Sequence, residues 1–473
     1  MNFGKLTHFD SVNVKGTWWP AGLARRKRSG TLHINCTEKI NLEVDGVFTR
    51  HHPFAPSLLF GPTNEETIFG ETDDGIPVSL LKCFWTQHDG ARTTYLANMA
   101  LTGVHVRALS AVKFQSFFLS FTGLDAWAAQ SPFRHEQASD DTWTVSYTDP
   151  PDLKVTVPQR RLSLYLRCAG STEARPTAVT MAFGNSVWVE PETPVSWRAF
   201  DELSGDILGL FTVLIGSPAI TRQVGGVMKV HQRRPTTKAS SRTRNGMVHV
   251  FRPHVKGFEV EEFSTPELLF PRPVLGERFE AVCRDWFKTT KVLRGMYRVL
   301  FSEMRTRSRY LEPRFFHFAQ CLESLHRKAI SRGGGKHLPK RRFKSWLRRV
   351  DGSLPKRMPK GMADAIRRVL PQANEFSFQD RLRSLFELLE TDTASHITTD
   401  VGRFVQAIRD TRNLFTHLEP RKKSFAFPKH QWFAAIDKMQ MLLLIHILKL
   451  CGLPEAEIRE RMRGLPRFRT PPL

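Results

Sequence analysis

An arginine and a histidine five positions apart, Arg412 and His417, are the residues of this sequence best suited to chemistry. The unperturbed pKa of histidine lies near neutrality, so its side chain can take a proton from a hydroxyl group. Arginine stays protonated, and its fork of donors suits the added charge of a phosphorane. Such a pair could cleave RNA without a metal ion, because the 2′-oxygen that loses its proton can attack the neighbouring phosphate. Two copies of the pair across a dimer would supply both a base and an acid.

The Arg-x4-His spacing alone is weak evidence, because the sequence contains it three times. Arg28…His33 and Arg332…His337 fall in loop-like or glycine-rich contexts, whereas the third copy falls in a predicted helix. At about 100° per residue, Arg412 lies inside the apolar stripe of that helix. A guanidinium on a packing face is costly unless it is paired or used. The stripe consists of Val401, Phe404, Val405, Ile408 and Phe415.

A polar ridge runs beside that stripe. Arg409, Asn413 and His417 follow one another at intervals of four residues, so Arg409 is a second candidate for the arginine of the site. Pro420 disfavours helical geometry at the residue before it. The helix should therefore end close to His417, where the imidazole could reach out of the bundle.

A structural ion pair is the alternative explanation for Arg412. Glu323 is its natural partner, because it lies on the flank of the apolar stripe of a predicted helix at Pro313–Ile330. His326 breaks that stripe much as Arg412 breaks its own. We expect the two helices to face each other or a symmetry mate, and the pattern is consistent with both catalysis and structural pairing.

The N-terminal half has the pattern of a β structure. Short runs rich in Val, Ile, Thr and aromatic residues alternate with turn signals up to about residue 195, which indicates a sandwich or an open barrel. A helix at Ser196–Leu214 and two further strands follow, with a basic hairpin loop or arm at Gln232–Asn245. The predicted strands include Thr31–Asn35, Ile40–Val44, Val78–Trp85, Val104–Leu109, Thr142–Tyr147, Leu162–Arg167, Ala178–Phe183, Gly225–Val230 and Met247–Val250.

The C-terminal half has helical periodicity and short loops, which indicate a bundle. The sequence thus predicts an α+β multidomain protein, with an all-β sandwich or barrel-like domain at residues 1–270 and an all-α helical bundle at 271–473. The helix Gln431–Cys451 is apolar nearly all round, so it is either central in its bundle or shared with a neighbour. The predicted helices are Gly276–Phe301, Pro313–Ile330, Lys340–Arg349, Lys360–Leu370, Ser377–Glu390, Ile397–Leu418 and Gln431–Cys451.

The charge of the chain points to a polyanionic partner. The net charge is +24 over 473 residues, and fifteen Lys or Arg against two acids lie between Arg327 and Arg368. We expect this segment to bind the RNA backbone, which is the commonest partner of such a surface. The residues chosen for this role are Arg341, Arg342, Lys344, Arg348 and Arg349. The six cysteines show no metal-binding spacing, so we expect no metal, and we expect no cofactor. The longest apolar stretches are too short or too interrupted to span a bilayer, so we expect a cytoplasmic protein without a membrane span.

These residues resemble a known family. The segment Ile408–His417 is similar to the Arg-Asn-x3-His signature of the HEPN superfamily, and above all to the HEPN domain of ApeA-type anti-phage defence proteins. The segments Phe318–Arg327 and Phe376–Leu382 resemble the earlier Glu…His-Arg helix and the Arg-Leu segment of that domain. In the N-terminal half, Lys15–Pro20, Ile68–Gly75 and Gly103–His105 resemble the domain that accompanies it.

The resemblance implies a homodimeric or larger endoribonuclease that needs no metal and acts in abortive antiviral defence. It implies catalytic roles for Arg412 and His417 and a supporting role for Asn413, beside which Glu323, His326 and Arg409 are supporting candidates. It implies host or phage RNA as the substrate, with tRNA as one candidate. The N-terminal domain would be a sensor or regulator, with a phage protein as its candidate trigger. Two other interpretations are a nucleic-acid-binding module without activity and a regulator that binds a phage protein but no RNA.

Overall fold

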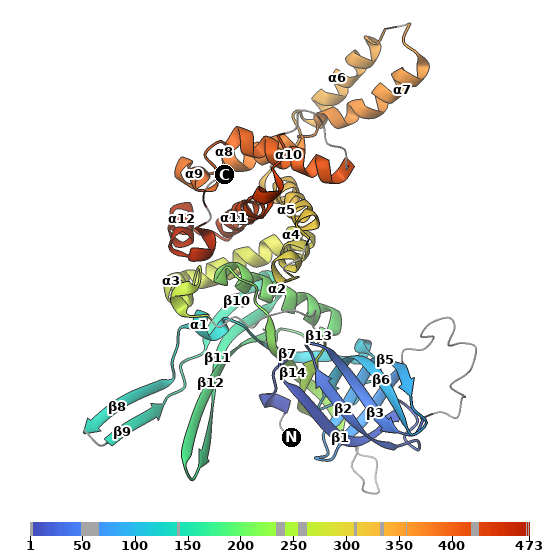
Figure 1. Cartoon of the computed structure of the whole chain (residues 1–473), viewed down its shortest axis with the longest axis vertical. Helices are drawn as coiled ribbons and strands as arrows, with labels where there is room; N and C mark the ends of the chain where they lie inside the picture. Colours follow the sequence, from blue (N-terminus) through green and yellow to red (C-terminus); the bar gives the residue numbers. More distant parts are fainter. Residues whose placement is uncertain are drawn as a thin grey trace. The chain divides into compact units, whose positions relative to one another are not determined.

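The computed structural model describes residues 3–48, 66–139, 142–232, 242–253, 263–306, 310–331, 335–355, 357–417, 425–469, 471 and 473. The chain divides into two compact units, Met1–Arg284 and Asp285–Leu473. The first unit carries all the named strands and the second is helical (Figure 1). The predicted order, a β-rich N-terminal half followed by a helical C-terminal half, is confirmed.

Six antiparallel strands close a barrel at the N-terminal end of the first unit. Each strand pairs with two others in the circular order β1-β2-β3-β6-β5-β4, and β4 returns to β1. A closed barrel leaves no free sheet edge. The strands are β1 (Ser11–Pro20), β2 (Arg28–Asn35), β3 (Lys39–Asp45), β4 (Glu66–Thr72), β5 (Pro77–His88) and β6 (Arg92–Thr102).

Three sequence segments that resemble the accompanying domain meet inside this barrel. Trp18 of β1 is fully buried and pairs with Gly70 of β4, where an added Cβ would lie 2.1 Å from the indole. His105 contacts the same strand, with Nε2 2.8 Å from the carbonyl oxygen of Gly70. These residues therefore determine the packing of the barrel.

The same sheet continues beyond the barrel from β6, in the order β6-β15-β14-β7-β12-β11-β10. Helix α2 (Trp197–Ile215) packs on β7, where the ring of Phe200 lies 4.6 Å from that of Phe114. The strands are β7 (Lys113–Phe121), β10 (Leu153–Val157), β11 (Leu162–Arg175), β12 (Ala178–Pro191), β14 (Thr221–Gln232) and β15 (Arg242–Phe251), with β13 (Val195–Ser196) beside β7 and a separate hairpin of β8 (Phe133–Ser139) and β9 (Thr142–Tyr147).

Two strand-level predictions in the first unit are wrong. Val104–Leu109 is not a strand, because β6 ends at Thr102 and Gly103 has a positive φ of 93°. The loop-like context given to Arg28 is also wrong, because Arg28 begins strand β2, whereas the predicted strand Thr31–Asn35, which contains His33, is confirmed. The predicted hairpin between β14 and β15 is present, but residues 242–245 belong to β15, and residues 233–241 lie outside the described part.

In the helical unit, α5 (Leu311–Leu325) packs against α8 (Phe378–Glu387), α10 (Val401–His417) and α11 (Trp432–Leu450). Thirteen of the nineteen residues of α11 are buried, as expected for a central helix, although Phe433 is exposed. The other helices of this unit are α6 (Lys340–Gly352), α7 (Lys360–Val369), α9 (Thr391–Ile397) and α12 (Glu455–Gly464). Helix α4 (Phe279–Thr306) begins in the first unit and continues into the second, and α1 (Leu124–Ala128) and α3 (Arg272–Leu275) belong to the first unit.

The predicted helix Ile397–Leu418 corresponds to α10, which begins four residues later than predicted, and Ile397 is the last residue of a separate helix, α9. Thr398 has an extended backbone that ends α9, and Asp400 then begins α10 by accepting a hydrogen bond from the amide of Arg403 at 2.9 Å. Such a side-chain cap satisfies an amide that would otherwise lack a partner. No helix in the described part of the chain is long and apolar enough to cross a membrane.

Candidate functional site

Arg412 lies on the packing face of α10, as the helical pattern predicted. The neighbouring stripe residues Phe404, Val405 and Ile408 are buried, while Phe415 is half-buried. The Arg412 side chain keeps 26% of its surface exposed. Its guanidinium therefore lies at the border of the core, where it meets both neighbouring side chains and solvent.

The Arg412 guanidinium contacts residues from two other helices. Nη2 lies 3.1 Å from Oε2 of Glu323 on α5. The centre of the guanidinium lies 4.4 Å from the ring centroid of Phe378 on α8 and 5.9 Å from that of Phe316 on α5. The ion pair with Glu323 is thus formed as the sequence predicted, but it is partly exposed rather than buried, so solvent screens it.

Glu323 is shared between two arginines. Its Oε1 accepts a hydrogen bond from Nη2 of Arg327 at 3.0 Å, while Oε2 faces Arg412. Arg327 lies on a π-helical turn, His326–Ile330, that continues α5. Such turns are rare and occur often at functional sites, because the extra residue redirects the side chains that follow it.

A buried His-Arg contact lies next to this ion pair. His326 and Arg381 are each 1% exposed, and Nη1 of Arg381 lies 3.5 Å from Nδ1 of His326. Burial, and secondarily the charge of Arg381, lower the pKa of His326, so this histidine is neutral near pH 7. Burial also lowers the pKa of Arg381, but a guanidinium remains protonated.

Arg381 belongs to the segment that resembles the family's Arg-Leu segment, but it was not among the predicted site residues. Its Nε has no hydrogen-bond partner among the described residues, and its Nη2 lies 3.9 Å from Glu375. Gly335, which has a φ of 71°, leaves room for the guanidinium of Arg381, because a Cβ atom at position 335 would lie only 2.3 Å from Nη1 of Arg381. Arg327, Arg381 and Arg412 face two carboxylates, those of Glu323 and Glu375, so this cluster carries a net charge of about +1, which favours an added anion such as a phosphodiester.

Arg409 has different partners from Arg412. Its Nε donates to Oδ1 of Asp410 at 2.8 Å, and its Nη1 donates to Oε1 of Gln379 on α8 at 2.6 Å. The other oxygen of Asp410 accepts the amide of Phe425 at 3.0 Å. Arg409 therefore joins α10 to α8, with its charge neutralised by the adjacent aspartate.

The other two residues of the motif lie farther along α10. Asn413 is half-buried on the turn that follows Arg409. His417 is the last residue of α10, as the position of Pro420 predicted, and its side chain lies outside the described part of the structure. Five residues of helix separate the Cα atoms of Arg412 and His417 by about 7.5 Å along the axis.

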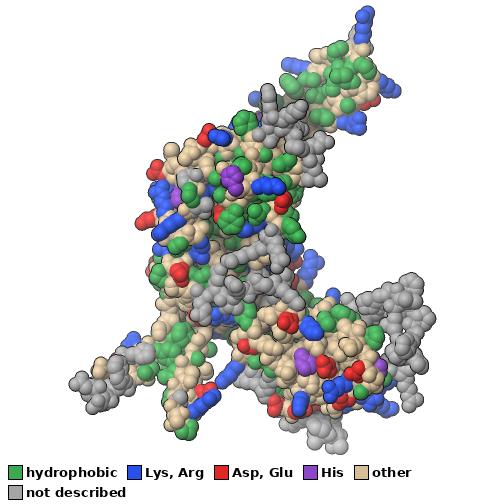
Figure 2. Space-filling view, viewed as in Figure 1, with side chains coloured by type: hydrophobic (Ala, Val, Ile, Leu, Met, Phe, Trp, Pro, Cys, Tyr) green, Lys and Arg blue, Asp and Glu red, His purple; other side chains and the backbone are tan. Residues whose placement is uncertain are grey.

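Helices α6 and α7 form a basic hairpin that extends from the rest of the helical unit (Figure 1). Figure 2 shows hydrophobic side chains along it with Lys and Arg around them. Its two acids, Asp351 and Asp364, both pair with Arg367, at 2.7 and 3.4 Å. The residues predicted to bind RNA are all exposed and have no ion pair within the described residues; they are Arg341, Arg342, Lys344, Arg348 and Arg349.

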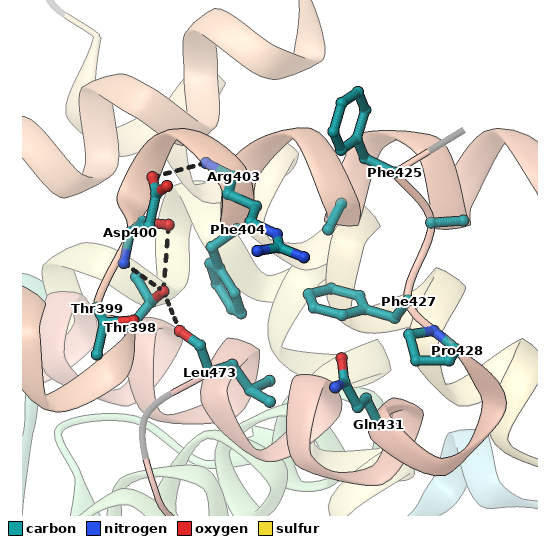
Figure 3. A pocket seen from close by; sticks show the side chains of 12 residues that line it. Thr398, Thr399, Asp400, Arg403, Phe404, Phe425, Phe427, Pro428, Gln431 and Leu473 are labelled. Atoms are coloured by element: carbon teal, nitrogen blue, oxygen red, sulfur yellow. Dashed lines mark hydrogen bonds between the residues drawn. The ribbon is translucent and has the colours of Figure 1, made fainter. Parts of the chain in front are cut away.

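A cavity of about 400 Å³ opens at the other end of α10. Phe404 and Phe427 line it, and Asp400 and Arg403 stand at its edge (Figure 3). Arg403 precedes Arg412 by nine residues, about 13.5 Å along the helix. The cavity therefore does not include the Arg412 cluster. Across the described ranges, no three His, Cys, Asp or Glu side chains are grouped so that they could hold a metal ion.

Comparison with known proteins identifies two segments of the chain. Residues 13–286 match the family model of the ApeA N-terminal domain 1. Residues 316–457 match the family model of the Apea-like HEPN domain, which covers Glu323, Arg381, Arg412 and His417. Searches of curated proteins and of solved structures gave no match.

Proposed function

The chain belongs to the ApeA family, a defence-associated family with a HEPN nuclease domain, and on this premise we propose that it is a metal-independent endoribonuclease of an antiviral, abortive-infection system. The observation that carries the proposal is the position of Arg412. Its guanidinium is partly exposed at the edge of the core, beside two further arginines, on the helix that ends at His417. That arrangement offers a phosphate a place next to a histidine that can move a proton.

The proposed reaction is an internal transfer of the phosphoryl group. His417 takes the proton of a ribose 2′-OH, and the 2′-oxygen forms a bond to the adjacent phosphorus. The bond from phosphorus to the 5′-oxygen breaks, and that oxygen receives a proton from a second imidazolium, which we assign to His417 of a second copy. The products are a 2′,3′-cyclic phosphate and a 5′-hydroxyl, so no water is consumed in this step.

Arg412 has the role of stabilising the charge that develops on the phosphorane. It can donate two parallel hydrogen bonds to two phosphate oxygens, which a lysine in the same place could not do. Glu323 now occupies that donor face at 3.1 Å. A phosphodiester that binds would compete with this carboxylate for Arg412 and Arg327, and Asn413 would support the bound phosphate from the next turn.

The substrate and the trigger follow from charge and from family. RNA of the host or of a phage is the proposed substrate, with tRNA as one candidate, and the exposed arginines of α6 supply backbone contacts. The N-terminal unit, with its closed barrel and the strands that continue from it, is the proposed sensor of a phage protein. A ribonuclease that acts on host RNA needs such control.

One incubation tests the reaction class. Purified protein is mixed with total RNA and a metal chelator, and the ends of the fragments are mapped. We expect cleavage that the chelator does not stop, with cyclic phosphate and 5′-hydroxyl ends. Cleavage that depends on a divalent ion, or 5′-phosphate ends, would contradict the proposed mechanism.

The formed Arg412–Glu323 pair favours a second candidate, in which the chain binds nucleic acid without cutting it. In that case Arg412 only joins α10 to α5, and Glu323→Gln would change stability alone. Binding of RNA by a protein that never cleaves it, under conditions where the chain is folded and oligomeric, would support this candidate.

A further inference from the structure

The basic hairpin of α6 and α7 carries an exposed aromatic side chain, which contact with phosphate groups alone would not require. Trp346 of α6 is 48% exposed. A single exposed apolar residue is ordinary on a protein surface. Trp346 is different because of its neighbours along the helix, which are Arg342 one turn before it and Arg349 one turn after it. Residues at these spacings lie side by side on a helix surface.

Both flanking arginines are exposed, and neither has an ion pair in the part of the chain that the structure describes. The two acids of the hairpin are already paired with Arg367. The charge of Arg342 and Arg349 is therefore available for a partner of opposite sign. Their position makes a ridge in which a π-face lies between two cations.

The indole ring has a second aromatic ring beside it. Trp346 lies nearly parallel to the ring of Phe343 one turn earlier, with an interplanar angle of 19° and a centroid distance of 6.3 Å. The two rings place an aromatic surface on the same side of α6, where a flat ligand could stack. The half-exposed indole offers a surface of the size and polarity of a nucleobase.

We propose that Trp346, between Arg342 and Arg349, is a stacking site for an unpaired base of single-stranded RNA. The arginines would bind the phosphates on either side of that base, and the indole would stack on the base itself. Alternation of cations with an aromatic ring is how proteins bind single strands without reading sequence. A duplex would gain only the phosphate contacts, because its bases are already stacked and covered.

This inference rests on the proposal that the chain acts on RNA, and it adds which form of RNA the hairpin selects. The enzyme would take hold of loops, bulges or unpaired ends. Specific recognition of RNA uses such segments more often than the deep groove of the duplex. The proposed cleavage also needs a flexible strand, since the 2′-oxygen must come into line with the leaving 5′-oxygen.

Binding by the full chain tests the proposal. The background is His417→Ala, so that the RNA stays intact, and the probes are labelled oligouridine of about 20 nucleotides and a paired RNA duplex of the same length. Fluorescence anisotropy is measured over a range of salt concentrations. We expect Trp346→Leu to weaken binding of the single strand by roughly tenfold, because a stacked base is worth about that factor or more. Duplex binding should change little.

Matched variants separate stacking from folding and from charge. Trp346→Phe keeps a ring and should retain most of the affinity, whereas Leu keeps only the apolar bulk. Trp85→Ala, at an indole of similar exposure (38%) on the barrel, should have no effect. Arg342→Gln should reduce the dependence of log affinity on log salt by about 0.7, the value for one phosphate contact on a single strand, while Trp346→Leu should leave that slope unchanged.

Three results would overturn the proposal. The first is unchanged single-strand affinity in Trp346→Leu. The second is an equal loss for single strand and duplex, which would mean that the indole only supports the helix. The third is a change in molecular mass without a change in RNA affinity, which would mean that Trp346 binds a second copy. Because binding is measured apart from cleavage, a protein that stacks RNA but never cuts it would refute the proposed activity and leave this inference standing.

Discussion

Replacing Arg412 and Arg409 separately by alanine distinguishes a catalytic arginine from a structural one. The two residues lie three positions apart on α10, and their side chains are similarly exposed, at 26% and 35%. Each has one carboxylate partner, Glu323 at 3.1 Å and Asp410 at 2.7 Å. The chain thus offers a matched control one turn from the residue under test.

The expected losses of stability are small and similar. A partly exposed ion pair contributes about 0–1 kcal/mol to the free energy of unfolding. Arg412 adds a cation–π contact with Phe378 at 4.4 Å, worth about 0.5–1 kcal/mol. Arg409 adds a hydrogen bond to Gln379, worth about 1 kcal/mol. Both alanine variants should therefore lose about 1–2 kcal/mol of unfolding free energy.

The expected losses of activity differ greatly. Removing one donor that stabilises developing charge lowers a rate constant by about 10²–10³. Arg412→Ala should show that loss, and Arg412→Lys should recover little of it because lysine lacks the planar fork. Arg409→Ala should stay within about threefold of the unchanged chain, since a neutralised residue away from the phosphate adds little to the transition state.

Two measurements on each variant decide the matter: urea unfolding for stability, and cleavage of a labelled RNA with protein in excess for the rate constant. Equal loss of activity in the two alanine variants would mean that activity only follows stability. A large loss in Arg409→Ala with little in Arg412→Ala would assign catalysis to the other arginine.

Three further expectations concern stability, RNA binding and assembly. Burial lowers the pKa of His446 to about 4, so below about pH 6.5 the unfolded chain binds a proton that the folded chain does not. Between about pH 7 and pH 5 this difference should cost the protein about 2 kcal/mol of unfolding free energy. His446→Gln should remove that part of the loss, as measured by urea unfolding. Light scattering should show at least a dimer at assay concentration, and an active monomer would exclude a site that uses His417 from two copies. Charge reversal on α6 should weaken RNA binding and lower its salt dependence, whereas an unchanged salt slope would limit this face to solubility; the positions are Arg341, Arg342, Lys344, Arg348 and Arg349.

The periodicity of the sequence was sufficient for most helices because a packed helix needs an apolar stripe. The same reasoning located Arg412 on a packing face and named Glu323 as its partner, a contact that the structure contains at 3.1 Å. The same reasoning could not predict how exposed the Arg412 side chain is, because that depends on how far α5 and α8 cover this part of α10. The partner of Arg409 was likewise hidden, because Gln379 lies on another helix.

The wrong strand at Val104–Leu109 shows where alternation misleads. Val104 and Val106 are buried, so the apolar pattern correctly indicates burial. Their backbone groups, however, bond to a side chain: the Ser79 hydroxyl donates to the carbonyl of Val104 and accepts from the amide of Val106, both at 2.8 Å. A loop whose backbone groups are hydrogen-bonded in this way can bury alternate residues, as a strand does, without pairing with another strand.

Arg381 could have been found by the criterion that found Arg412. It lies between Phe378, Leu382 and Leu385 on the apolar stripe of α8, where a charge is equally unexpected. What the sequence could not reveal is its contact with His326, since the two residues lie 55 positions apart and on different helices. Local rules describe regular helices, and this site lies where one helix departs from regularity.

The most direct test of the account is the rate of RNA cleavage by His417→Ala in the presence of a metal chelator, with His430→Ala as the matched control. His430 is an exposed histidine on the turn before α11, outside the proposed site. The account predicts that His417→Ala loses at least about 10²-fold in rate while remaining folded and oligomeric, and that His430→Ala cleaves at the rate of the unchanged chain. Cleavage by His417→Ala at the full rate would contradict the assignment of His417 as the catalytic base.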